Sequence, residues 1–160
     1  MNKNRFMDKV LEAEQTLYHV AKSILIHDED CEDAVQGAIL KAYDKLDTLK
    51  EEQYFKTWLI RMLLNECYSL KRREIPKIPY EECFEYIEGE EQNDYSDLYI
   101  AIKKLTPKIR ITVVLYYVEG YSVEEIKKIL RIPSGTVKSR LAKGRKLLKV
   151  KLENMEEVYE

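Results

Sequence analysis

The side chains best suited to binding chemistry lie in residues 119–147, EGYSVEEIKKILRIPSGTVKSRLAKGRKL. Apolar residues recur there at three- and four-residue spacing in two short blocks, which predicts two amphipathic helices. A tight turn that contains Pro133 separates the blocks, and the second helix is cationic on its exposed side. This arrangement is typical of a helix-turn-helix that reads duplex DNA, because the major groove admits one α-helix between walls of phosphate.

Local signals mark the ends of these two helices. Ser122 can accept a hydrogen bond at an N-cap, and Glu125 can return one three residues later, which makes a capping box. Gly120 suits the chain reversal just before it. Pro133 ends the first helix because the residue before a proline is driven out of the α region. Ser134 is placed to cap the second helix.

The second helix divides into a core side and a DNA side. Val137, Leu141, Gly144 and Leu148 fall on one apolar stripe. The opposite side and its flanks collect small and cationic residues: Gly135, Thr136, Lys138, Ser139, Arg140, Ala142, Lys143, Arg145 and Lys146. Small residues in the centre with cations at the edges suit the groove. A solvated basic face is the competing interpretation, and the paired caps and the turn favour DNA binding.

Charge is distributed unevenly along the chain. Residues 97–151 hold 14 Lys and Arg against 4 Asp and Glu, whereas residues 74–95 hold 1 against 8, so the net charge of −2 conceals a basic module. A local cationic surplus favours binding to a polyanion through counterion release. The acidic segment either competes with DNA for this module or is a solvated spacer.

The chain is expected to be all-α. Glycine and proline are scarce (5 and 4), and 45% of the 160 residues are apolar, which with the periodicity predicts two small helical domains joined by an acidic linker. The C-terminal domain is expected to be a four-helix module that contains the helix-turn-helix. The expected organisation is an N-terminal domain at 1–73 with helices near 6–26, 31–46 and 54–73, an acidic linker at 74–95, a C-terminal domain at 96–152 and an acidic tail at 153–160.

Aromatic residues are expected in both cores. Trp58 has apolar neighbours on the third helix, which favours a core position over base stacking. Ahead of the helix-turn-helix, Thr106 and Pro107 suit the N-cap and first position of a helix. The predicted core face of that helix is Ile109 or Ile111 with Val113, Val114 and Tyr117.

No catalytic or metal-binding set emerges from the sequence. Cys31, Cys67 and Cys83 are far apart, form no CxxC pair and make no ligand set with His19 or His27. We therefore expect free thiols in a reducing cytoplasm, no metal, no cofactor, no small-molecule substrate and no enzymatic activity. The N-terminus MNKNRFMDKV lacks the apolar core of a signal peptide, and no apolar run is long enough to span a membrane.

Three stretches follow one another along nearly the whole chain: residues 30–36 with 40–43 (DCEDAVQ, LKAY), residues 55–61 with Asn65 and 71–73 (FKTWLIR, KRR), and residues 105–107, 119–122 and 135–140 (LTP, EGYS, GTVKSR). The first is similar to the second conserved region of bacterial RNA polymerase sigma factors. The next resembles their promoter-opening helix, and the last resembles their fourth region. In this order they resemble the extracytoplasmic-function (ECF) group, the minimal two-domain sigma factors.

The resemblance implies that the chain directs core RNA polymerase to promoters. It would contact the clamp helices and flap of the polymerase, and its N-terminal domain would capture the unwound −10 element. The polymerase-docking positions would be Asp33, Gln36, Leu40 and Tyr43. The −10 positions would be Lys50, Gln53, Lys56, Arg61, Asn65, Arg72 and Arg73. Leu40 and Tyr43 also fit a buried core, and the charged positions also fit a solvated helix face.

The C-terminal domain would read the −35 element. The base-facing positions implied by the resemblance are Lys138, Ser139, Ala142 and Lys143. The helical wheel independently favours the last three of these. Phosphate contacts are expected from Thr136, Arg140, Arg145 and Lys146. An anti-sigma factor, commonly anchored in the membrane in this family, would hold the protein inactive.

Two other classes of protein fit part of the sequence. A free-standing helix-turn-helix regulator would use its N-terminal half for dimerisation or ligand binding and would bind two-fold related half-sites alone. A pure protein-interaction module would carry the basic helix incidentally. The helix expected at 54–73 ends in Lys71, Arg72 and Arg73. This second cationic face argues against both classes, since neither needs one.

Overall fold

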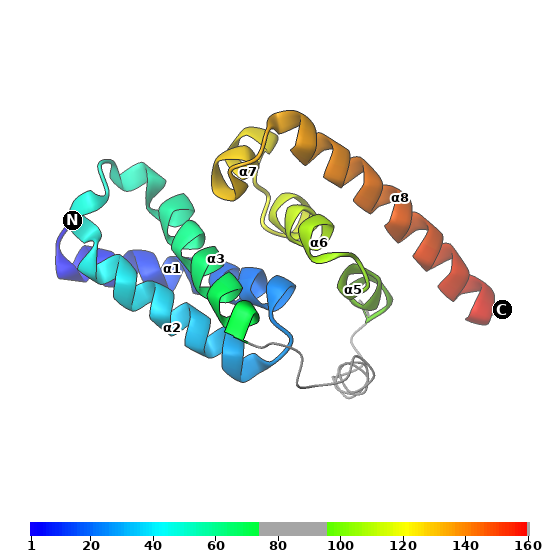
Figure 1. Ribbon diagram of the computed structural model, residues 1–160, viewed down its shortest axis with the longest axis horizontal. Coiled ribbons are helices and arrows are strands. Elements are labelled where there is room, and N and C mark those ends of the chain that lie inside the picture. The colour runs from blue at the N-terminus through cyan, green and yellow to red at the C-terminus, as the bar shows by residue number, and fades with distance from the viewer. Residues whose placement is uncertain (74–95, 160) are drawn as a thin grey trace.

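The computed structural model describes residues 1–73 and 96–159, and every element in these two ranges is helical (Figure 1). The helices are α1 (Lys3–Ile24), α2 (Asp28–Asp44), α3 (Phe55–Arg73), α5 (Ser96–Lys103), α6 (Pro107–Val113), α7 (Val123–Leu130) and α8 (Ser134–Tyr159). The short elements are the 3-10 turns η1 (Leu46–Thr48) and η2 (Glu52–Tyr54) and the π-helical turn η3 (Val114–Val118). The predicted all-α fold is confirmed, and the predicted linker lies outside the described residues.

Helices α1, α2 and α3 form the N-terminal group, each within a few residues of its predicted bounds. The Asn2 side chain caps α1 by accepting a hydrogen bond from the backbone N–H of Arg5 at 2.8 Å. Three acidic residues open α2, where the positive end of the helix dipole stabilises them. Leu17, Leu59 and Leu63 are fully buried where the three helices meet, so burial of apolar faces holds the group together.

Aromatic rings join the three helices near the start of α1. Phe6 meets Tyr43 of α2 and Phe55 of α3 edge-on, with ring centroids 5.5 Å and 5.6 Å away. The Trp58 ring lies 5.9 Å from that of Phe55, centroid to centroid, and is half-buried. Trp58 therefore packs on the core, as predicted, with part of its ring exposed.

A π-helical turn rotates the chain after α6. The amide of Glu119 donates to the carbonyl of Val114 at 3.0 Å, an i→i+5 bond. Val113 is buried as predicted, but Tyr117 is 50% exposed, so its predicted place in the core is wrong. The wider turn shifts the helical phase and turns Tyr116 and Tyr117 outward, where their rings contact each other edge-on.

The first helix of the helix-turn-helix has the predicted local structure. Ser122 accepts from the amide of Glu125 at 3.1 Å, and the Glu125 carboxylate accepts from the amide of Ser122 at 3.3 Å, so the capping box is complete. Gly120 has a φ of 75°, in the left-handed region that glycine adopts without strain. α7 ends at Leu130, and Arg131 follows it in the left-handed conformation with a φ of 55°.

Helix α8 begins at Ser134 itself, one position earlier than a cap at that residue requires. It continues to Tyr159, so the acidic residues expected as a tail prolong the helix. Val137, Leu141 and Gly144 are buried on its inner side, which confirms these members of the predicted core stripe, and Leu148 is half-buried there. α8 packs along α6 and α5.

The two groups of helices also pack against each other, α6 on α1 and α7 on α3. One buried apolar cluster takes in residues of both groups, such as Leu59 and Leu115. Across this junction the Arg110 guanidinium donates to the carbonyl of Ser23 at 2.6 Å. We call this packing of the two groups the closed arrangement.

Glu119 makes the second polar contact across the junction. Its Oε2 accepts a hydrogen bond from the Thr16 hydroxyl at 2.7 Å, and its Oε1 lies 2.6 Å from Nδ1 of His19. The Glu119 side chain is only 7% exposed, whereas that of His19 is 44% exposed. The Glu119 carboxylate is therefore nearly buried against α1.

Burial predicts slow reaction of two cysteines. Cys31 and Cys67 are buried free thiols, and burial raises the pKa of Cys31 to about 11 and of Cys67 to about 12. Since the thiolate is the nucleophile, we expect both to react with iodoacetamide at pH 8 at least about 100-fold more slowly than an ordinary thiol. Mass spectrometry of digested samples measures each rate separately. Labelling as fast in the folded chain as in urea would contradict this prediction.

Candidate nucleic-acid interface

The outward side of α8 carries the residues predicted to read bases. Lys138, Ser139, Ala142 and Lys143 are all exposed, opposite the buried stripe. The small side chains of Ser139 and Ala142 leave room for base edges, and the two lysines supply cations at the border. α8 thus presents a surface that fits a major groove, and the role of each residue stays a prediction.

The predicted phosphate contacts divide between two places. Lys146 is exposed on the free side of α8, and Thr136 is half-buried near its start. Arg145 donates from Nη1 to the Tyr117 hydroxyl at 2.9 Å, which ties it to η3. Arg140 is half-buried and lines a pocket between the two groups of helices. The structure therefore does not bring Arg140 to the same free surface as Lys146.

The turn of the helix-turn-helix contributes three cations that the sequence analysis did not select. Lys127, Lys128 and Arg131 line a shallow groove with Ser134, at the start of α8. The free N–H groups and the dipole at a helix start favour an anion, so the groove suits a DNA phosphate. The sequence feature that could have indicated these residues is a lysine pair and an arginine shortly before the start of a predicted helix.

The residues predicted to contact the −10 element spread along α3 and the turns before it. Most of them are exposed, namely Lys50, Gln53, Lys56, Asn65, Arg72 and Arg73. The Nζ of Lys56 lies 5.8 Å from the centroid of the Tyr121 ring, a cation–π contact with the other group of helices. Arg72 and Arg73 lie in the last turn of α3, where the negative end of the dipole favours cations.

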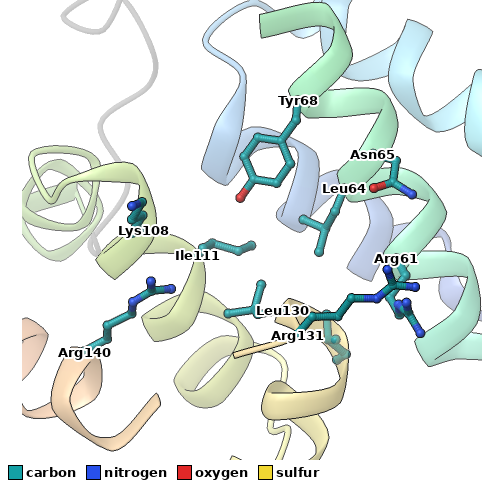
Figure 2. Close-up of a pocket in the computed structure, with 10 residues that line it drawn as sticks. Arg61, Leu64, Asn65, Tyr68, Lys108, Ile111, Leu130, Arg131 and Arg140 are labelled. Atoms are coloured by element: carbon teal, nitrogen blue, oxygen red, sulfur yellow. The ribbon is translucent and has the colours of Figure 1, made fainter. Parts of the chain in front are cut away.

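Arg61 and Asn65 face the C-terminal group and line a pocket of about 210 Å³ (Figure 2). The other polar residues of its wall are Tyr68, Lys108, Arg131 and Arg140. A predicted −10 residue, Arg61, and a predicted −35 phosphate contact, Arg140, thus share one pocket. Sequence reasoning missed Tyr68, although it follows Arg61 and Asn65 at the i, i+4, i+7 spacing of one helix face. Burial raises the pKa of Tyr68.

The predicted polymerase-docking residues form one face of α2. Asp33, Gln36, Leu40 and Tyr43 recur at three- and four-residue spacing and are all exposed. Leu40 is 66% exposed and Tyr43 is 47% exposed, so a core position for Leu40 is excluded. The Tyr43 ring contacts that of the buried Phe6 edge-on. The role of this face in polymerase docking stays a prediction.

Other kinds of site are not found in the described part of the chain. Residues 1–73 and 96–159 contain no group of three His, Cys, Asp or Glu arranged to hold a metal ion. In the same ranges no helix combines the length and apolarity of a membrane span.

Comparison with known proteins identifies two conserved regions. Residues 10–74 match sigma-70 region 2, and residues 96–148 match sigma-70 region 4. RNA polymerase sigma factor SigV of Bacillus subtilis (strain 168) is 25% identical over 89% of this chain and 88% of its own length. ECF RNA polymerase sigma factor SigW of the same organism is 28% identical over 96% of this chain and 92% of its own length.

Two solved structures resemble the closed arrangement as a whole. Sigma factor RpoE in complex with the anti-sigma factor NepR, from Bartonella quintana, has a TM-score of 0.75 at 25% identity and covers 93% of this chain and 97% of that chain. CnrH in complex with the cytosolic domain of CnrY shares the fold, with a TM-score of 0.73 at 24% identity over 96% and 90% of the two chains. The matches to sigma-70 regions 2 and 4 and to SigV and SigW favour a sigma factor over a free-standing regulator. The chain belongs to the ECF group of the sigma-70 family, whose members direct core RNA polymerase to promoters.

Proposed function

We propose that this sigma factor binds a promoter at two points while it is held on core RNA polymerase. Residues 1–73 dock on the clamp helices and capture the unwound −10 element, and residues 96–152 read the −35 element beside the flap. The observation that carries this proposal is the exposed row of small and cationic side chains on α8, backed by a buried apolar stripe. Such a face suits direct readout in the major groove.

Each predicted set of residues has one task in this proposal. The face of α2 binds the polymerase through Asp33, Gln36, Leu40 and Tyr43. The −10 strand is held by Lys50, Gln53, Lys56, Arg61, Asn65, Arg72 and Arg73. The −35 bases are read by Lys138, Ser139, Ala142 and Lys143, and the −35 phosphates are bound by Thr136, Arg140, Arg145 and Lys146. The turn cations Lys127, Lys128 and Arg131 extend this phosphate footprint.

The chain performs no bond-making step of its own in this proposal. The polymerase supplies catalysis in the cytoplasm, and the sigma factor supplies specificity through binding at two elements. An anti-sigma factor, anchored in the membrane, covers the docking and DNA-binding faces until it is released. The complexes of RpoE with NepR and of CnrH with the cytosolic domain of CnrY support such a partner.

Run-off transcription tests the function directly. The purified chain and core polymerase are incubated with promoter templates, and we expect RNA that starts at one position and requires both proteins. A chain that neither binds core polymerase nor starts promoter-dependent RNA synthesis would refute the proposal. Tight binding to a two-fold symmetric duplex without polymerase would instead indicate a free-standing regulator.

Replacing Lys143 by alanine tests base reading at the −35 element. Loss of one base-edge contact is expected to weaken −35-dependent initiation by about 1–3 kcal/mol and to leave binding to core polymerase unchanged. Lys149→Ala removes the same charge from an exposed position elsewhere on α8 and serves as the control. The readout is run-off RNA from paired templates with and without a −35 match, and an equal loss on both templates would exclude base reading by Lys143.

A further inference from the structure

Four cations line the pocket between the two groups of helices. They are Arg61 of α3, Lys108 of α6, Arg131 after α7 and Arg140 of α8, and none of the lining residues that the structure describes is acidic. Within the described parts of the chain, none of these four side chains makes an ion pair. Like charges around so small a space repel one another. The arrangement therefore favours an anion between them.

The lining side chains come from both groups of helices. In Figure 2, Arg61 and Arg131 lie on one side, Lys108 and Arg140 lie on the other, and the hydroxyl of Tyr68 points into the space between them. The apolar part of the wall is Leu64, Ile111, Ile129 and Leu130. Lys108 and Arg131 are exposed, whereas Arg61 and Arg140 are half-buried, so the apolar wall strengthens the attraction of an anion mainly to Arg61 and Arg140.

The backbone at Arg131 is an independent indication that its side chain has a role here. Its φ of 55° lies in the left-handed region, where a residue that ends a helix is most often glycine. A non-glycine residue in this conformation costs roughly 1–3 kcal/mol. At this position the chain has a guanidinium that lines the pocket, and strain of this kind gathers at ligand-binding sites.

The size of the pocket limits what can fill it. Its volume of about 210 Å³ is below the roughly 300–1,000 Å³ of pockets for drug-sized ligands, so neither a duplex nor a peptide helix fits inside. Arginine forks match phosphate oxygens two at a time, and three arginines line this wall. We infer that the pocket binds a compact phosphate anion of the diphosphate class, as free pyrophosphate or as the phosphate tail of a nucleotide.

Such an anion would hold the closed arrangement together, because its ligands come from both groups of helices. The −35 and −10 elements are about 25 base pairs apart, or about 85 Å along B-DNA. Arg61 and Arg140, which line one pocket here, cannot contact both elements of one promoter at once. The bound anion therefore opposes promoter binding. Only this consequence rests on the proposed function; the binding site itself does not.

Isothermal titration calorimetry of the full chain tests the site with sodium pyrophosphate as the probe, at fixed pH and ionic strength. We expect one pyrophosphate per chain, bound at least about tenfold more tightly than sulfate. Titrations with adenosine diphosphate and with adenosine distinguish free pyrophosphate from the phosphate tail of a nucleotide as the bound anion. Tighter binding of the diphosphate than of pyrophosphate indicates a nucleotide, equal binding indicates the phosphate chain alone, and adenosine is expected not to bind.

Two variants locate the site on both groups of helices. Arg131→Gly removes a cation and relieves the left-handed strain, so it should weaken pyrophosphate binding about tenfold or more while the chain becomes no less stable to urea. Arg61→Gln should weaken binding comparably from the other group. Lys149→Gln makes the same change in net charge at an exposed position outside the pocket, and we expect it to bind like the unmodified chain.

The possible results distinguish a specific anion site from attraction by net charge. Equal affinity for sulfate and pyrophosphate, or equal weakening by Lys149→Gln, means that net charge alone attracts the anion and overturns the inference. Weakening by only one of Arg61→Gln and Arg131→Gly overturns a site shared by both groups. Run-off transcription without added pyrophosphate tests the proposed function independently of the anion site. A chain that initiates transcription normally but binds no pyrophosphate would therefore refute only the anion site.

Discussion

Replacing Gly144 by alanine is expected to lower the free energy of unfolding by about 1–3 kcal/mol, although alanine is the better helix former by about 1 kcal/mol. Gly144 lies on the inner side of α8, against α6. A Cβ atom there would lie 2.6 Å from Cγ2 of Val113 and 3.1 Å from Cγ2 of Ile109. Both neighbours are buried and branched at Cβ, so neither can rotate away easily. The two helices must move apart instead.

The matched control is Gly135→Ala in the same helix. Nothing lies within 4 Å of a Cβ atom at Gly135, so we expect the helix-propensity gain alone and an unchanged or slightly higher stability. Urea unfolding followed by circular dichroism measures both variants. If Gly144→Ala matched Gly135→Ala in stability, α6 and α8 would not be in the close contact described.

The consequence of overpacking reaches the DNA-binding face. Lys143 is the direct neighbour of Gly144 in the chain and lies about 100° around the helix from it, at an exposed position. A helix pushed away from α6 would carry with it the side chains predicted to face the bases, and a misplacement of even about 1 Å weakens directional hydrogen bonds. The packing of α8 on α6 therefore also determines the position of the exposed side of α8.

Much of the fold could be predicted from local sequence, because local interactions determine it. The capping box of Ser122 and Glu125 closes within four residues, and the apolar stripe of Val137 and Leu141 depends only on helical periodicity. Even the place of Gly144 on this stripe follows from its position. The sequence does not predict that a side chain at position 144 would clash with Val113, because Val113 belongs to another helix.

The failed prediction for Tyr117 has a definite cause. A helical wheel assumes 3.6 residues per turn, whereas the bond from Glu119 to Val114 makes a wider π turn. The phase of the wheel shifts there by about one residue, which is enough to move Tyr117 from the core to the surface. Composition gives no warning of such a turn.

The pocket between the groups lay beyond sequence reasoning for a different reason. Its walls join α3 to α6, α7 and α8, and periodicity shows which face of each helix is apolar but not which helix covers it. The contact of Thr16 with Glu119 spans 103 positions in the chain. Pairings over such distances depend on the whole fold. Hence Tyr68, Lys108 and Glu119 became candidates only through the structure.

Under the proposed function, we expect the contacts of Glu119 to oppose polymerase binding. Its nearly buried carboxylate accepts from Thr16 and meets His19, both on α1. A hydrogen bond to a charged group contributes about 1.5–3 kcal/mol, whereas the exposed side of His19 weakens its share through solvent screening. In the proposed function the two groups separate on the polymerase to reach two promoter elements, so we expect each of these interactions to oppose the polymerase-bound state.

Glu119→Ala is therefore expected to strengthen the apparent binding of core polymerase by up to about 10- to 100-fold. The apparent dissociation constant scales inversely with the fraction of the competent state, and the lost contact shifts that fraction by its free energy. Thr16→Val, which keeps the shape and removes the donor, should give a smaller gain, and His19→Ala the smallest. Fluorescence anisotropy of the labelled chain titrated with core polymerase measures all three.

Glu124→Ala controls for charge, because Glu124 is an exposed carboxylate of α7. Circular dichroism establishes that each variant remains helical, and small-angle X-ray scattering follows the separation of the two groups. A larger radius of gyration for Glu119→Ala together with tighter polymerase binding means that the closed packing competes with the polymerase. If Glu119→Ala and Glu124→Ala bound core polymerase equally well, the junction would be a contact that the polymerase does not need to break.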